Sequence, residues 1–410
     1  MNAMKYHELF TLLKQKTNFE EDFIQIDEQM EVHNFTFVSN NSRILPGETE
    51  HTCMEHSFST SGMFQPNNSD FVPSLALDVQ DAHVKENMKF RYHIFRPAGT
   101  QKSKSAILFF HGFNEKNWYK YYPWAYRLVE LTGKAVVLFP IAFHMNRAPK
   151  EWSDRHLMSE VSNARKSNFP GIIASSLVNA AISTRLHTKP QRFIWSGLQS
   201  YYDVIQLVEE IRQDRHTLIS PEAHFDIFAY SIGGLLAKTL LMTNKDNCFD
   251  NSRLSLFCSG TAFSRLTPVC KFIMDSETEQ ALYRYIVGYM DMHLKQDAWL
   301  GHHLSQEHPE GWNFLSLLNY NKLSEHREKM LKSLHERIYA VALEKDTVIP
   351  AYEVLNTLKG RLRNIPVCVD IEDFSYDYRH EDPFPVKEQI SDKVDESFSR
   401  VFSKLGGFLA

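Results

Sequence analysis

The chain has 410 residues, of which 43% are hydrophobic and 13% aromatic, and its formal net charge is −5. This is enough material for a large core and long for a single domain, so one α/β domain with insertions and a domain plus an extension both fit. The negative charge and the lack of a long basic run argue against nucleic acid as a partner.

The cysteines and the hydropathy pattern indicate a cytoplasmic protein without a membrane span. Five cysteines are scattered along the chain and form no C-x-x-C pair, so reduced, mostly buried thiols are expected. Residues 1–21 are polar and mixed in charge, unlike a signal peptide, and no apolar run is long enough to cross a bilayer. A cytoplasmic location follows as the default.

The first part of the chain, residues 1–85, predicts an extension packed on a main domain. Residues 6–16 show helical spacing of apolar positions, and residues 32–38 alternate like a strand. Residues 40–70 are rich in Asn, Ser, Gly, Thr and Pro, which is typical of a loop.

From residue 86 onward, short apolar runs alternate with helical segments. This alternation predicts an α/β fold with a mostly parallel central sheet, right-handed crossovers and flanking helices. Strands are expected at residues 90–95, 106–110, 135–139, 225–228, 254–258, 338–343 and 367–371. Helices are expected at residues 118–131, 172–183, 197–216, 232–242, 352–359 and 390–402.

One segment interrupts this pattern late in the chain. Residues 261–335 contain helical segments and an aromatic, His-rich tract, and they predict a helical cap inserted into the domain. The core of the domain is then formed by residues 86–260 and 336–410.

The motif Ala-Tyr-Ser-Ile-Gly-Gly at residues 229–234 follows the run at 225–228 and opens the helix at 232–242. A serine on a sharp strand-to-helix turn, flanked two residues away by small residues, is typical of a nucleophile elbow. The serine backbone must be strained to expose its Oγ, and the strand and helix approach closely at Ala229 and Gly233. The first small residue is usually Gly, and Ala here leaves open a helix N-cap role for Ser231.

A nucleophilic serine needs a histidine base and an acid that orients the histidine. In an open α/β sheet, such residues lie in loops past the carboxyl ends of strands. Asp346 follows the strand at 338–343, and His380 follows the strand at 367–371. The order Ser231, Asp346, His380 is that of α/β-hydrolases. Two alternatives stay open. Glu344 could be the acid in place of Asp346, and His380 could be a non-catalytic loop histidine that pairs with Glu381.

Backbone N–H groups must also stabilise the negative oxygen that develops during acyl transfer. One donor is expected from Ile232, which directly follows Ser231. The second is expected from the loop after the strand at 106–110, with Phe113 as first choice and Asn114 as second.

Taken together, four segments resemble the α/β-hydrolase superfamily over about residues 88–405. They are His-Gly-Phe at 111–113, the elbow at 229–234, Lys-Asp-Thr-Val-Ile-Pro at 345–350 and His-Glu-Asp-Pro-Phe at 380–384. The resemblance implies an α/β-hydrolase fold with Ser231 as nucleophile, His380 as base and Asp346 as orienting acid. It also implies that the insertion lies over the active site, where its aromatics would form an apolar wall.

Other polar residues favour no metal or cofactor. His302, His303 and His308 lack H-E-x-x-H spacing and a matching set of acids, so no metal is expected. His111 is interpreted as structural, and Arg147 as a surface ion pair rather than a substrate-binding residue.

The sequence thus predicts a serine hydrolase that cleaves an ester, thioester or small amide, with a small-molecule acyl substrate. Two alternatives remain. A non-catalytic protein of this fold could bind a ligand, since fold does not fix function. An acyltransferase would use the same three residues.

Overall fold

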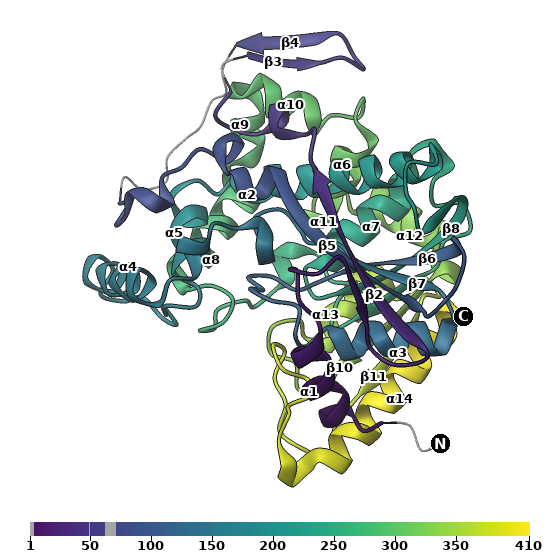
Figure 1. Cartoon of the computed structure of the whole chain (residues 1–410). Coiled ribbons are helices and arrows are strands. Elements are labelled where there is room, and N and C mark those ends of the chain that lie inside the picture. The colour runs from purple at the N-terminus through teal and green to yellow at the C-terminus, as the bar shows by residue number, and fades with distance from the viewer. Residues whose placement is uncertain (1–3, 49, 62–70) are drawn as a thin grey trace.

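The computed structural model describes residues 4–48, 50–61 and 71–410. Within these residues, nine strands form one sheet in the order β1-β2-β5-β7-β6-β8-β9-β10-β11, and β3 and β4 form a separate hairpin (Figure 1). The strands are β1 (Phe23–Gln25), β2 (Met30–Val38), β3 (Glu50–Cys53), β4 (Phe58–Ser61), β5 (Lys89–Pro97), β6 (Ser103–Phe110), β7 (Ala135–Leu138), β8 (Ile219–Tyr230), β9 (Leu254–Phe257), β10 (Ile338–Leu343) and β11 (Cys368–Glu372).

The sheet is parallel from β7 to β11, while β5 runs antiparallel to both of its neighbours. Helices cover both of its faces. They are α1 (Tyr6–Lys16), α2 (Lys85–Met88), α3 (Tyr122–Thr132), α4 (Arg155–Asn168), α5 (Ala180–Thr188), α6 (Arg192–Arg212), α7 (Gly233–Thr243), α8 (Ser276–Tyr283), α9 (Met290–Gln296), α10 (Ala298–His303), α11 (Pro309–Leu318), α12 (Ser324–Ser333), α13 (Ala351–Leu358) and α14 (Ser391–Leu409).

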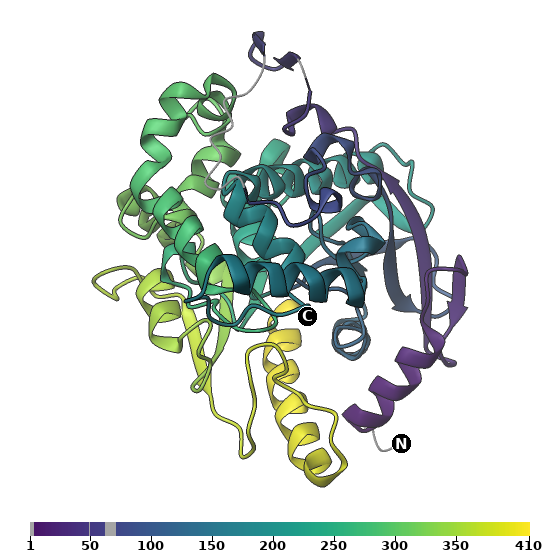
Figure 2. The same cartoon turned by 90° about the vertical axis from the view of Figure 1, so that its left-hand side faces the viewer.

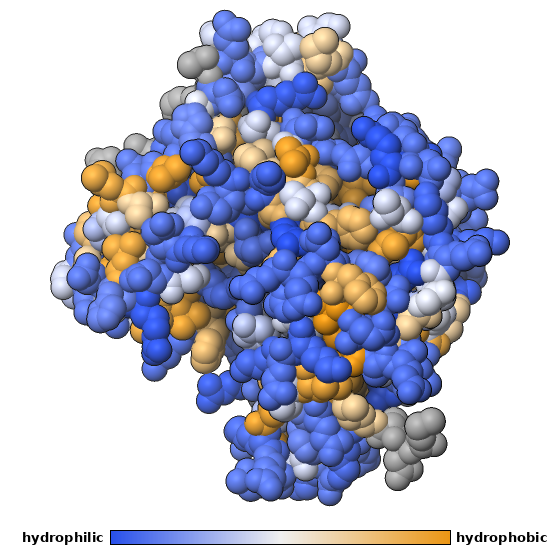
Figure 3. All heavy atoms as spheres, in the orientation of Figure 1, coloured by the Kyte–Doolittle hydropathy of each residue, from blue (hydrophilic) through white to orange (hydrophobic). Residues whose placement is uncertain are grey.

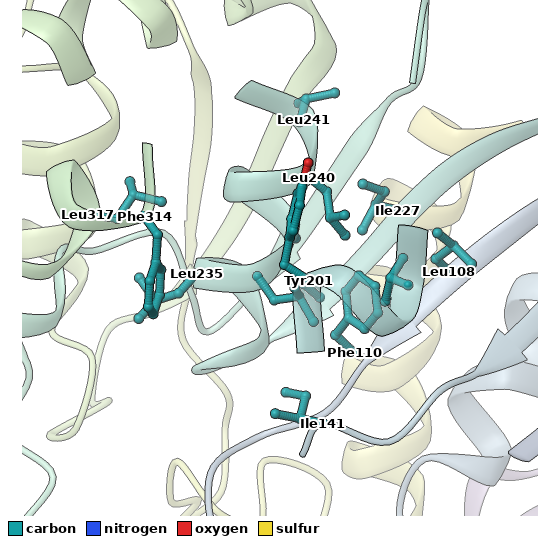
Figure 4. Close-up of a cluster of buried hydrophobic side chains, with 14 of the residues drawn as sticks. Leu108, Phe110, Ile141, Tyr201, Ile227, Leu235, Leu240, Leu241, Phe314 and Leu317 are labelled. Carbon is teal, nitrogen blue, oxygen red and sulfur yellow. The ribbon is translucent and has the colours of Figure 1, made fainter. Parts of the chain in front are cut away.

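Alternate residues of the central strands face two separate cores. On β6, Leu108 and Phe110 point toward α6, α7 and α11, where side chains from these helices gather in Figure 4. Ile107 and Phe109 point the other way, toward α3 and α14. Strands buried on both faces read as continuous apolar runs, which is why residues 106–110 are recognisable as a strand.

The N-terminal segment contributes directly to the sheet. β2 pairs with β5 over its whole length, from Met30 opposite Pro97 to Val38 opposite Lys89. The division near residue 85 therefore does not separate the sheet from the first part of the chain, because β1 and β2 both precede it. The division of the chain into extension, core and cap stays a prediction.

Helix α1 packs against α14, at the opposite end of the chain (Figure 2). The backbone N–H of Tyr6 donates to Asp395 at 2.9 Å, and Lys5 pairs with Asp392 at 2.5 Å. The ring of Tyr6 lies 4.6 Å from that of Phe398. The first helix is thereby part of the layer that covers one face of the sheet.

Most predicted elements are present with shifted ends. The strand expected at 225–228 is longer, since β8 begins at Ile219, and the helix expected at 172–183 begins later, as α5. The loop expected at 40–70 contains the hairpin of β3 and β4, and its residues 62–70 lie outside the described part. Helix α4 was not predicted, because most of its side chains are polar or charged.

The face of the molecule in Figure 3 is mostly hydrophilic, with several groups of apolar residues among the polar ones. Among the described residues, no helix is long and apolar enough to cross a membrane.

Candidate active site

The turn after β8 has the geometry of a nucleophile elbow. Ser231 adopts φ of 55°, a left-handed conformation that is strained for a residue other than glycine. A Cβ at Gly233 would lie 2.8 Å from the carbonyl oxygens of Phe110 and His111, so no larger residue fits there without movement. Ala229 is fully buried in the sheet. The steric reason for a small residue at 233 is thus visible in the structure.

Two further side chains attach the elbow and α7 to the loop after β9. The hydroxyl of Ser259 donates to the backbone carbonyl of Ser231 at 2.6 Å. The buried amino group of Lys238 donates to the carbonyls of Gly260 at 2.8 Å and Thr261 at 3.2 Å. Lys238 thus links the helix behind the serine to Thr261, where the predicted insertion would begin.

The three residues proposed as catalytic from the sequence are brought together. Ser231 Oγ lies 2.7 Å from His380 Nε2, and His380 Nδ1 lies 2.7 Å from Asp346 Oδ2. The other oxygen of Asp346 accepts from the backbone N–H groups of Val348 at 2.9 Å and Ile349 at 2.8 Å. The carboxylate is therefore held in place, and it accepts the Nδ1–H of His380, which leaves Nε2 free to accept from the serine.

The rival acids are placed elsewhere. Glu344 is exposed, whereas Asp346 is buried against His380. Glu381 accepts a hydrogen bond from the thiol of Cys270 at 2.7 Å. Asp346 is thus the carboxylate that the structure pairs with His380.

Tyr230, which directly precedes the serine, contacts both the backbone and the ring of His380. Its hydroxyl donates to the backbone carbonyl of His380, and the two rings stack with centroids 5.4 Å apart. Burial raises the pKa of Tyr230 well above its usual range, which keeps the hydroxyl protonated as a donor. A Cβ at Gly112 would lie 3.2 Å from the Tyr230 ring. Nothing in the sequence indicates this contact, although Tyr230 lies within the recognised motif.

The expected oxyanion donors border the same cavity as the serine. Phe113 and Ile232 both line the small cavity beside Ser231. In the described part of the chain, neither of their backbone N–H groups donates to a protein acceptor. The loop that carries Phe113 is fixed by His111, whose Nε2 accepts from the N–H of Ile141 at 3.0 Å. Burial lowers the pKa of His111 well below its usual range, so the imidazole stays neutral, in keeping with a structural role.

Asn114, the second choice as oxyanion donor, has a different contact. Its side-chain amide donates to the carbonyls of Val178 at 3.1 Å and Phe272 at 2.6 Å. It adopts φ of 57°, a conformation that asparagine tolerates well. The side chain therefore joins the loop after β6 to the insertion.

The cavity beside Ser231 is small and apolar. It encloses about 10 Å³, close to the space that one water needs. Ser231 itself is only 7% exposed. The insertion supplies half of the lining, and the full set is Phe113, Ser231, Ile232, Phe263, Leu266, Pro268, Ile273, Met274, Val348 and Ile349.

The aromatic wall expected from the insertion is only partly present. Phe314 lines a second apolar pocket of about 40 Å³ that also borders Phe113 and Ile232, and it lies beside Leu235 in Figure 4. Trp299 instead donates its indole N–H to the carbonyl of Ile44. Other aromatics of the insertion, such as Tyr283 and Tyr289, are exposed.

Arg147 differs from its expected surface position. It is fully buried, and its guanidinium pairs with the equally buried Asp203 at 2.6 Å. It also donates to the side chain of Asn87 at 3.1 Å. Arg147 fits neither a surface ion pair nor a substrate-binding residue, because its donors are used inside the protein.

The matching family model decides the family of the chain. The model of a family of unknown function (DUF6051) matches residues 4–410. The chain belongs to this family. No curated protein matches this DUF6051 member at a significant level.

Several solved structures are similar to this DUF6051 member. Carboxyl esterase 2 from the mycorrhizal fungus Tuber melanosporum is 12% identical, over 79% of this chain and 82% of that chain, with a TM-score of 0.40. A thermostable esterase from Pseudomonas putida is 12% identical, over 78% of this chain and 80% of that chain, with a TM-score of 0.41. An esterase from Pyrobaculum calidifontis is 11% identical, over 79% and 82% of the two chains, with a TM-score of 0.39.

The fold class predicted for this DUF6051 member is confirmed. A large, mostly parallel sheet is flanked by helices, and a strained serine turn follows the central strand β8. The loops after β10 and β11 carry the acid and the histidine. These features constitute the α/β-hydrolase fold.

Proposed function

We propose that the chain is a serine hydrolase of the carboxylesterase type, which cleaves an ester, thioester or small amide through an acyl-enzyme. The observation that carries this proposal is the continuous relay from Ser231 through His380 to Asp346, with 2.7 Å at each step. Such a relay supports catalysis over the alternative of a non-catalytic binding protein, which does not need it.

The proposed reaction follows from the positions of these atoms. The Oγ of Ser231 attacks the substrate carbonyl carbon while His380 Nε2 accepts its proton, and Asp346 stabilises the imidazolium that forms. The N–H groups of Phe113 and Ile232 stabilise the oxyanion, each by about 3 kcal/mol. His380 then protonates the leaving group, and the acyl-enzyme forms. A water activated by the same imidazole releases the acid and restores the serine.

The lining of the site suggests the kind of acyl group. Both cavities beside Ile232 are mostly apolar. Among the described residues, none of the side chains that line these two cavities forms an ion pair. An apolar acyl chain would therefore be favoured over a charged one. Because about 10 Å³ cannot hold an acyl group, we infer that the insertion moves as a lid when substrate binds.

Labelling with a small alkyl fluorophosphonate tests the proposal. Wild type should be labelled at one serine, and Ser231→Ala should not be labelled. Ser403→Ala is a matched control, because Ser403 is exposed on α14 and far from the elbow in sequence; it should be labelled like wild type. Labelling of Ser231→Ala at the wild-type rate would exclude this nucleophile. A folded wild type that is never labelled would favour the binding protein.

A further inference from the structure

The hairpin of β3 and β4 lies against the helical insertion, far from it in sequence. In Figure 1 the hairpin is at the top, beside α9 and α10. Cys53 ends β3 and His56 lies in the hairpin turn, whereas His302 is near the end of α10 and His308 precedes α11. These four residues share one small region, although no local sequence pattern connects them.

The four side chains direct their ligand atoms toward one point. One ligand atom from each residue lies within 4.8 Å of all the others. Cys53 Sγ is 3.5 Å from His56 Nδ1 and 3.7 Å from His308 Nε2, and the Nε2 atoms of His302 and His308 are 3.0 Å apart. A tetrahedral zinc with Zn–S of about 2.3 Å and Zn–N of about 2.0–2.1 Å places sulfur and nitrogen about 3.6 Å apart, and two nitrogens about 3.4 Å apart.

The hydrogen bonds of His308 also favour a cation between these four side chains. His308 Nδ1 lies 2.7 Å from Glu310 Oε1, which also accepts from the hydroxyl of Tyr202 at 2.6 Å. Because a carboxylate only accepts, His308 carries its proton on Nδ1 and directs a lone pair from Nε2 toward Cys53 and His302. A carboxylate behind a ligating imidazole is the usual outer contact of a metal-bound histidine.

We propose that Cys53, His56, His302 and His308 bind one zinc ion in a closed, tetrahedral, structural site. One thiolate and three imidazoles suit zinc, and four protein ligands leave no position open for catalysis. This goes beyond the expectation of no metal, which considered the spacing of the histidines only within the insertion. The proposal is independent of the serine hydrolase assignment, since the two sites share no residue.

The hairpin itself indicates what the ion does. Among the strands of the described residues, β3 and β4 pair only with each other, and an isolated two-stranded hairpin is marginally stable in water. The ring of Phe58 stacks on that of His302 at 4.3 Å, so the hairpin already contacts the insertion through one ligand. The zinc would join the two segments, since each contributes two ligands.

Metal analysis of the full-length chain, purified without a polyhistidine tag, tests the site. We expect about one zinc per chain, and X-ray absorption should show one sulfur at about 2.3 Å and three nitrogens at about 2.0–2.1 Å. Cobalt(II) added to the chelator-treated protein should give the visible spectrum of a tetrahedral site with a thiolate charge-transfer band. Folded wild type that neither contains zinc nor takes it up would overturn the proposal.

Variants identify the ligands. Cys53→Ser and His56→Gln should each lose most of the zinc. Cys368→Ser should retain it, because that cysteine is exposed and outside the cluster. His303→Gln should also retain it, although His303 forms an alternative group with His308 and Glu310. Loss of zinc in His303→Gln with retention in Cys53→Ser would refute the proposed ligand set. If Cys53→Ser fails to fold, X-ray absorption of the zinc in the wild type tests the ligand set instead, because it counts the sulfur and nitrogen ligands.

Discussion

The close approach of α7 to β6 behind the candidate nucleophile can be tested by replacing Gly233 with alanine. The added Cβ would lie 2.8 Å from the carbonyl oxygens of Phe110 and His111 and 2.9 Å from the Cβ of Phe110. Two of the three contacts are with backbone at the end of β6, which is paired with both β7 and β8. These atoms cannot rotate away, so the helix must move.

The size of the effect follows from two opposing contributions. Overpacking of this kind costs about 1–3 kcal/mol, while replacing glycine by alanine in a helix gains up to about 1 kcal/mol. We expect Gly233→Ala to be destabilised by about 1–2 kcal/mol. Gly407→Ala is the matched control, because Gly407 is a helical glycine whose added Cβ would meet no described atom within 4 Å beyond its chain neighbours and its own helix backbone. It should be unchanged or more stable by up to about 1 kcal/mol.

Urea unfolding gives both stabilities from the midpoint and slope of the transition. The rate of fluorophosphonate labelling at Ser231 gives a second readout, because a displaced α7 shifts the N–H of Ile232 away from the loop of Phe113. Gly233→Ala should therefore be labelled more slowly than Gly407→Ala. Equal stability and equal labelling of the two variants would refute the argument that close packing at this glycine shapes the elbow.

Three other substitutions have defined outcomes. Asp346→Asn should slow serine labelling by about 10⁴-fold, because the amide no longer fixes the tautomer of His380, while circular dichroism stays unchanged. Asp275→Asn should lower urea stability by about 3–5 kcal/mol, since it leaves the fully buried guanidinium of Arg165 unpaired. Burial lowers the pKa of Lys238 to about 7. Above that pH the amine is therefore mostly neutral in the folded protein, whereas it stays protonated in the unfolded chain. Wild-type stability should therefore rise between pH 7.5 and 9, by at most about 1.4 kcal/mol per unit, relative to Lys238→Met in urea titrations.

The site was largely predictable from the sequence because the fold determines where its polar residues lie. The mostly apolar runs before Ser231 and Asp346 mark the carboxyl ends of β8 and β10, whereas β11, which precedes the loop of His380, is more polar and contains Asp370. The glycine at 233 meets a local steric requirement, so its position relative to Ser231 can be recognised in a short stretch of sequence. The roles of the three residues remain a proposal that labelling must test.

Contacts between distant segments could not be predicted in this way. Cys53 and His308 are 255 residues apart, and neither lies in a pattern that indicates its partner. The stacking of Tyr230 on His380 depends on how the loop after β11 folds back, which periodicity does not report. The burial of Arg147 likewise depends on Asp203, which is a charged residue among the buried residues of the amphipathic helix α6.

The docking of α1 on α14 has a consequence for how the chain folds. The hydrogen bond from Tyr6 to Asp395 closes a loop of 389 residues, so the entropy of closing that loop must be overcome before the contact contributes. During synthesis, α1 is made long before α14, so Tyr6 lacks its contacts with Phe384 and Phe398 until those residues emerge, although α1 can already pack against α3. The packing around α1 is therefore completed late, and the part of its apolar face that α14 covers is open to aggregation or to a chaperone in the meantime.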